Sequence, residues 1–206
     1  MTPREHIDRM KINRDRFSSV PAAVDVSPED TEFFSSLDSP LRVAVITEDW
    51  CGDHVSTTPV LYRLAEESSE LEVRVFKRDD NWDLAQTYLP ENRRDTVPVF
   101  VFFTPEEMRQ ISLFIETAPE LVPSIDGMED AIRKAHPEVP DINGDVNDMS
   151  QSTRDLLRQE RTAFRIDHSS EWGRIIAHSL REVVAQGLAR EPGQGPAEGG
   201  TKWPPT

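Results

Sequence analysis

Cys51, the one cysteine among the 206 residues of this chain, is the residue with the clearest potential for chemistry. It follows an apolar run over residues 41–46 that predicts a strand, and a helical pattern starts directly after it. A thiol at a helix N-terminus faces unsatisfied backbone N–H groups and the positive end of the helix dipole, and both favour the thiolate. The position therefore predicts a reactive thiol; the alternative is that Cys51 is a small buried hydrophobic residue.

Three polar neighbours could take part in that chemistry. His54 lies one helical turn after Cys51, where an imidazolium would stabilise the thiolate or a neutral imidazole could accept its proton. The alternative is that His54 is a solvated residue without a role. Glu48 and Asp49 precede the cysteine and could transfer protons, or they could form an ordinary solvated turn. Their negative charge raises the pKa of the thiol and so opposes the effect of the helix.

The Trp-Cys-Gly-Asp run at 50–53 resembles the active-site turn of the thioredoxin superfamily, in particular that of bacterial thioredoxin-like proteins. Pro59 stands where thioredoxins carry a proline inside the active-site helix. The Val97-Pro98 pair precedes an apolar run, as the cis-proline loop of the family precedes a central strand. The resemblance covers residues 40–118.

This resemblance implies that Trp50, Gly52, Val97 and Pro98 form a substrate-binding surface beside the thiol. In that arrangement Val97-Pro98 is cis, and backbone groups of Val97 are free to pair with an extended peptide. Two simpler structures remain open. Trp50 could be a packed core aromatic residue, and Pro98 could be a trans proline that starts an ordinary strand.

The chain departs from the family at two positions. His54 occupies the place of the second cysteine of a dithiol motif, and Val45 occupies the place of the acid that thioredoxins bury before it. A single cysteine cannot form an internal disulfide. Two functions follow. The first is a monothiol oxidoreductase in which Cys51 exchanges with disulfides or mixed disulfides of proteins or small thiols. The alternative is a catalytically degenerate thioredoxin-fold binding module that recognises a protein or peptide, so enzymatic activity is left open.

The pattern along the chain predicts an α/β fold, a thioredoxin-like mixed sheet of about four to five strands flanked by helices, with extra helices at both termini. The predicted strands are 41–46, 71–76, 97–103 and 110–115. The predicted helices are 4–19, a short helix capped by Ser27, 51–68, 81–89, 128–136, 150–166 and 169–188. The division is an N-terminal helical extension (1–39), a core (40–118), a helical part that completes the core (119–189) and a disordered tail (190–206).

Composition excludes several classes of partner. A net charge of −15 argues against nucleic acid and anionic membranes, because both require basic patches. The chain has no apolar run of the roughly 20 residues a membrane helix needs, and no apolar signal core, so we expect a cytoplasmic protein. No second Cys/His pair accompanies residues 51 and 54, and no Gly-rich phosphate loop is present, so neither a metal nor a cofactor is expected. The helical additions could form a partner or homodimer surface.

Overall fold

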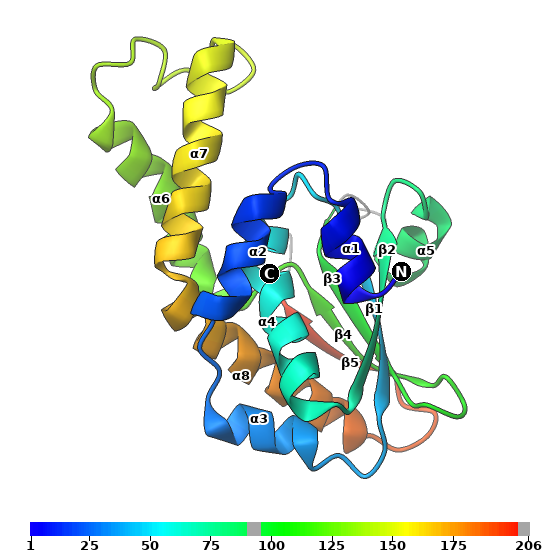
Figure 1. Cartoon of the computed structure of the whole chain (residues 1–206). Coiled ribbons are helices and arrows are strands. Elements are labelled where there is room, and N and C mark those ends of the chain that lie inside the picture. Colours follow the sequence, from blue (N-terminus) through cyan, green and yellow to red (C-terminus); the bar gives the residue numbers. More distant parts are fainter. Residues whose placement is uncertain (90–95, 202–206) are drawn as a thin grey trace.

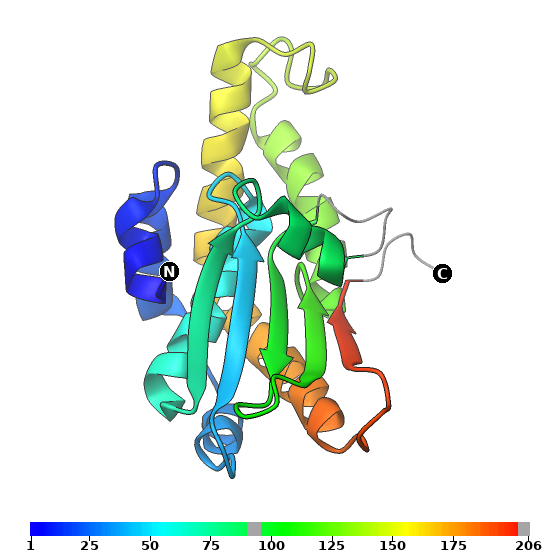
Figure 2. The same cartoon turned by 90° about the vertical axis from the view of Figure 1, so that its right-hand side faces the viewer.

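The computed structural model describes residues 1–89 and 96–201, and its centre is a five-stranded mixed sheet in the order β2-β1-β3-β4-β5 (Figure 2). β1 pairs parallel to β2 and antiparallel to β3, β3 pairs antiparallel to β4, and β4 pairs parallel to β5. The strands are β1 (Leu41–Thr47), β2 (Leu71–Lys77), β3 (Val99–Phe103), β4 (Gln110–Ile115) and β5 (Ala197–Gly200). The predicted fold class, an α/β mixed sheet of thioredoxin type, is confirmed.

Helices cover the sheet unequally. Most of them pack on one face, and α5 covers part of the other (Figures 1 and 2). The helices of the described residues are α1 (Pro3–Arg9), α2 (Arg14–Ala23), α3 (Pro28–Ser35), α4 (Gly52–Ser68), α5 (Trp82–Tyr88), α6 (Val122–Ala135), α7 (Gln151–Asp167) and α8 (Ser169–Leu188), with a 3-10 turn at Pro119–Leu121.

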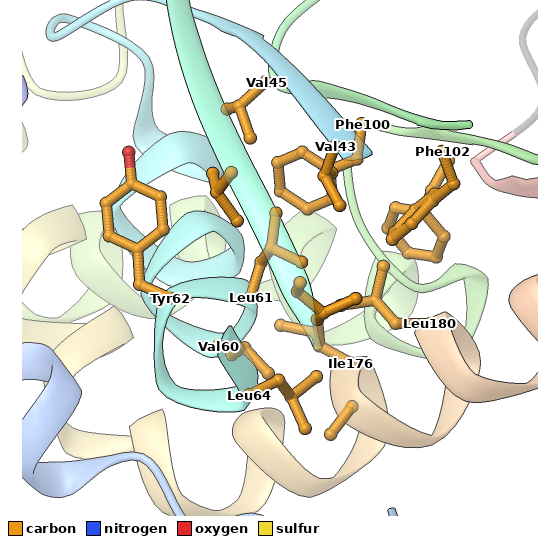
Figure 3. Packing of buried hydrophobic residues seen from close by; sticks show 14 of the residues in the cluster. Val43, Val45, Val60, Leu61, Tyr62, Leu64, Phe100, Phe102, Ile176 and Leu180 are labelled. Atoms are coloured by element: carbon orange, nitrogen blue, oxygen red, sulfur yellow. The ribbon is translucent and has the colours of Figure 1, made fainter. Parts of the chain in front are cut away.

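The main hydrophobic core lies between the sheet and the two long helices α4 and α8 (Figure 3). Alternate side chains of β1 and β3, such as Val43 and Phe100, point into this layer and meet Leu61 of α4 and Ile176 of α8. Burial of these side chains fixes the register of the central strands, because a slip by one residue would turn them to the opposite face.

α6 and α7 form a hairpin that extends beyond the sheet (Figure 1). The hairpin has its own hydrophobic cluster, whose buried members are Met128, Ile132, Ile142, Met149 and Leu157. α6 begins at Val122, six residues before the predicted start, and α7 and α8 begin within one residue of their predicted starts. Within residues 1–89 and 96–201, no helix is both long enough and apolar enough to cross a bilayer.

Two sequence predictions at the ends of the chain are wrong. The single helix over 4–19 is two helices, because Asn13 adopts the left-handed conformation (φ 62°), which asparagine tolerates and a continuous helix does not. The tail expected to be disordered contributes β5 to the sheet edge. Gly200 makes this possible: it has φ 83°, and a side chain there would collide with the backbone of Ile115. Residues 202–206 lie outside the described residues.

Candidate functional site

Cys51 is the N-cap residue of α4 and lies against the loop that leads into β3. The Val97–Pro98 peptide bond in that loop is cis, and the Cys51 thiol donates a hydrogen bond to the carbonyl oxygen of Val97, with Sγ and O 3.1 Å apart. Backbone N–H groups of Asp53 and His54, in the first turn of α4, are directed at the sulfur. The thiol therefore joins the turn at residues 50–53 to the loop, and as a donor it keeps its proton.

The surroundings of Cys51 favour this protonated form. The residue is 8% exposed, and burial, followed by the negative charge of Asp53, raises the pKa of the thiol to about 12. The two backbone N–H groups and the Arg165 guanidinium act in the opposite direction and are outweighed. At neutral pH the thiolate that a helix N-terminus would favour is a minor form.

The His54 side chain lies in the protein interior. It is completely buried, and its Nδ1 lies 2.8 Å from the hydroxyl oxygens of both Thr47 and Thr58. Its ring stacks on Phe17 of α2, with centroids 4.7 Å apart. Burial, and then the neighbouring His6, hold the pKa of His54 well below its usual value, so the imidazole is neutral. The alternative of a solvated His54 is wrong, and an imidazolium that stabilises a thiolate does not fit this environment.

His6 is a second buried histidine at the site, and the sequence analysis gave it no role. Its Nδ1 lies 2.9 Å from the Tyr62 hydroxyl, and its ring lies 5.1 Å from that of His54. Burial, then the charges of Lys77 and the N-terminus, lower the pKa of His6 to about 4. The only sequence signal for this position is the four-residue spacing to the apolar Met10, which places both on one face of a helix.

Asp49 attaches the N-terminal helices to the turn. Its carboxylate forms an ion pair with Lys77 and accepts a hydrogen bond from the backbone N–H of Lys11 at 3.1 Å. Its carbonyl oxygen accepts from Asn13 Nδ2 at 3.0 Å. The neighbouring Glu48 accepts from the backbone N–H of Asp79 at 2.9 Å. Both acids are buried, so the alternative of a solvated turn is wrong. Their carboxylates and the Asp49 carbonyl are engaged in bonds that connect the turn to residues 11–13 and to residues 77–79.

Gly52 and Asp53 contact α7. Arg165 donates from Nη2 to Oδ1 of Asp53 at 3.1 Å, and its guanidinium lies directly over Gly52. The sequence did not indicate this arginine, because it lies 112 residues after Asp53 in a helix whose docking the local pattern does not encode.

Trp50, in contrast, points outward. It is 50% exposed, so the alternative of a packed core aromatic residue is wrong. The Arg78 guanidinium lies 5.1 Å from the ring centroid of Trp50 and 5.4 Å from that of Trp82, which is 39% exposed. Trp50 and Trp82 thus flank one arginine at the surface; we call these three residues the tryptophan platform. Val97 and Pro98 are buried beside the turn.

Metal ligation finds no support in the described part of the chain. Among residues 1–89 and 96–201, no group of three or more His, Cys, Asp or Glu side chains is arranged to hold a metal ion.

Comparisons with known proteins place the turn and the proline loop in one family region. A family model described as thioredoxin matches residues 1–129, which include the turn and the loop but not α7. A solved protein of unknown function, PA1234 from Pseudomonas aeruginosa, is similar at 13% identity and a TM-score of 0.49, over 79% of this chain and 90% of that one. An HIV epitope scaffold is similar at 13% identity and a TM-score of 0.42, over 82% and 95%. The comparison with curated proteins gives no match.

Proposed function

The chain belongs to the thioredoxin family, and we propose that it uses the family fold as a binding module for a protein or peptide, with a cysteine that has a structural role. The observation that carries this proposal is the bond from the buried Cys51 thiol to Val97 O. That bond keeps the proton on a sulfur that disulfide exchange requires as a thiolate.

Disulfide exchange requires a thiolate, and the surroundings of Cys51 keep its thiol protonated. The attacking species is the thiolate, and with a thiol pKa of about 12 its fraction at pH 7 is on the order of one in 10⁵. An unperturbed thiol, with a pKa of about 8.5, would supply a few per cent. His54 does not compensate as a proton acceptor, because burial holds the pKa of its imidazole well below the usual value.

What the turn offers to a partner is the tryptophan platform. Most side chains of the turn bind other parts of the chain, whereas Trp50 and Trp82 present apolar ring surface to solvent. Tryptophan combines a large contact area with low conformational entropy and is enriched among residues that dominate interface energies. Val97 is buried and its carbonyl oxygen accepts from the thiol, so side-chain contacts at the platform, rather than a strand paired at Val97, would supply the affinity.

Monothiol exchange is the second candidate function. The backbone N–H groups of Asp53 and His54 and the Arg165 guanidinium all lower the pKa of Cys51. In this reaction the Cys51 thiolate attacks one sulfur of a disulfide and forms a mixed disulfide, while the other sulfur leaves as a thiolate. A low-molecular-weight thiol, or a cysteine of another protein, would then release Cys51 as a thiolate and leave with the substrate sulfur in a new disulfide.

Two measurements separate these functions. The protein is incubated with glutathione disulfide at pH 7.5, and its intact mass is measured by mass spectrometry. A binding module is expected to keep its mass over hours, whereas rapid and reversible addition of one glutathione would support exchange. Peptides are then selected from a displayed random library on the wild-type protein. The binding module retains them in Cys51→Ser and loses them in Trp50→Ala; loss in Cys51→Ser with retention in Trp50→Ala would contradict it.

A further inference from the structure

Arg165 is a buried cation at the base of the α6–α7 hairpin, and it faces the active-site turn. Its side chain is 7% exposed, with Nη2 on Asp53 and Nη1 3.4 Å from Met128 Sδ on α6. Its Nε has no hydrogen-bond partner among the described residues. A buried guanidinium with incomplete hydrogen bonding is costly, so stability alone does not account for an arginine at this position.

The turn is shaped to receive this side chain. A Cβ atom at Gly52 would lie 2.9 Å from Cζ of Arg165, closer than real Cβ contacts come, and 3.0 Å from its Nη2, so the guanidinium would have to move. Gly52 is the first residue of α4, directly after the N-cap Cys51. Gly52 therefore leaves space for the guanidinium, and the Asp53 carboxylate pairs with it, so that these two residues form the binding site of the Arg165 side chain on the turn.

We propose that Arg165 is the positioning residue through which the α6–α7 hairpin closes over the active-site turn and keeps Cys51 out of solvent. The burial of the thiol then depends on the closed hairpin as well as on its bond to Val97 O. A partner that draws Arg165 away from Asp53 would expose the thiol. This inference deepens the proposed function, and it rests on that proposal only in taking the turn at 50–53 as the functional site.

The consequence of opening is measurable because burial is the first cause of the raised thiol pKa. Each pKa unit recovered toward the ordinary value multiplies the thiolate fraction at a fixed pH by about ten. If Arg165 acted instead through its charge, its removal would leave Asp53 unneutralised and would slow the reaction of the thiol.

The test is the rate of Cys51 alkylation by iodoacetamide at pH 8 in the full-length protein. Arg165→Ala is expected to raise the rate about tenfold or more. Gly52→Ala is expected to raise it several-fold, because the new methyl group displaces the guanidinium, and to add nothing in the Arg165→Ala background, where the clash is absent. Arg158→Ala is the matched control: Arg158 is exposed on the same helix, pairs with Asp155 there, and its removal leaves the rate unchanged.

Three outcomes overturn the inference: an unchanged or slower rate in Arg165→Ala, equal effects of Gly52→Ala in both backgrounds, or an equal acceleration in Arg158→Ala. A thermal melt of each variant at pH 8 identifies any acceleration caused by global unfolding. The wild-type rate alone tests the proposed function, and the ratio of variant to wild type tests the closure by Arg165, so that the two can fail separately.

Discussion

Mild acidification is expected to destabilise this protein, because His6 and His54 are neutral and completely buried in the folded chain. The pKa of His6 is lowered to about 4, and that of His54 lies well below its usual value. In the unfolded chain both imidazoles take up protons near pH 6.5. Below that pH the unfolded state binds more protons than the folded state. The contribution of these two histidines to the free energy of unfolding is therefore fully present above about pH 6.5 and is lost as the pH falls toward 4.

The size of the loss follows from these pKa values. At pH 5 the solution is about 1.5 pH units below the unfolded pKa of histidine and still above the folded pKa of His6. At about 1.4 kcal/mol per pH unit, His6 accounts for about 2 kcal/mol of lost unfolding free energy, and His54 adds a loss in the same direction. A loss of about 2 kcal/mol from His6 alone is a large share of the roughly 5–15 kcal/mol typical of a folded domain.

The assay is urea unfolding at pH 7, 6 and 5, followed by circular dichroism. His6→Gln and His54→Gln cannot titrate in this range, so each variant is expected to lose less stability than the wild type between pH 7 and pH 5, by about 2 kcal/mol in His6→Gln, whatever its stability at pH 7. His178→Gln, at an exposed histidine of α8, is the matched control and keeps the wild-type slope. Equal wild-type stability at pH 7 and pH 5, or wild-type slopes in both buried-histidine variants, would refute the reasoning.

Three further predictions concern stability and are measured by urea unfolding at pH 7. Cys51→Ser retains a donor to the proline loop and should cost less than about 1 kcal/mol; a much larger loss would show that sulfur packing dominates there. Asp49→Ala removes the carboxylate that pairs with the largely buried Lys77 and holds the N-terminal segment. It should lower the free energy of unfolding by about 3 kcal/mol and speed proteolysis before residue 24. Unchanged resistance to proteolysis would contradict the role of Asp49 in holding this segment. Gly187→Ala places a methyl group against atoms of β4 and should cost at least about 2 kcal/mol. Gly127→Ala, whose new methyl group would have nothing within 4 Å, should stabilise the protein by roughly 0.5–1 kcal/mol. Equal effects of the two substitutions would refute the packing argument.

The sequence predicts the central part of this fold well because that part follows local rules. The apolar runs that become β1, β2 and β4 have the strand period or a buried-strand composition, and Ser27 caps its helix as its sequence indicates. The position of the thiol at a helix N-terminus also follows, because strand, turn and helix signals are adjacent in the chain.

The surroundings of the thiol could not be predicted, because they depend on segments far away in the sequence. Asp49 and His54 are polar and adjoin a turn, a pattern typical of solvated residues, yet α1 and α2 fold over both. Arg165 reaches the turn from the C-terminal third of the chain. β5 escaped detection because a strand of small residues at a sheet edge is held by backbone pairing and close packing, which leave no apolar alternation.

The rate of Cys51 alkylation between pH 6 and pH 10.5 tests the central claim, a buried and protonated thiol that holds the turn to the proline loop. We expect the logarithm of the rate to rise linearly with pH, without a plateau, because the raised pKa lies above this range. A plateau with a midpoint at or below about pH 8.5, the ordinary thiol value, would show an accessible thiolate. That result would contradict the structural role of Cys51 and favour monothiol exchange.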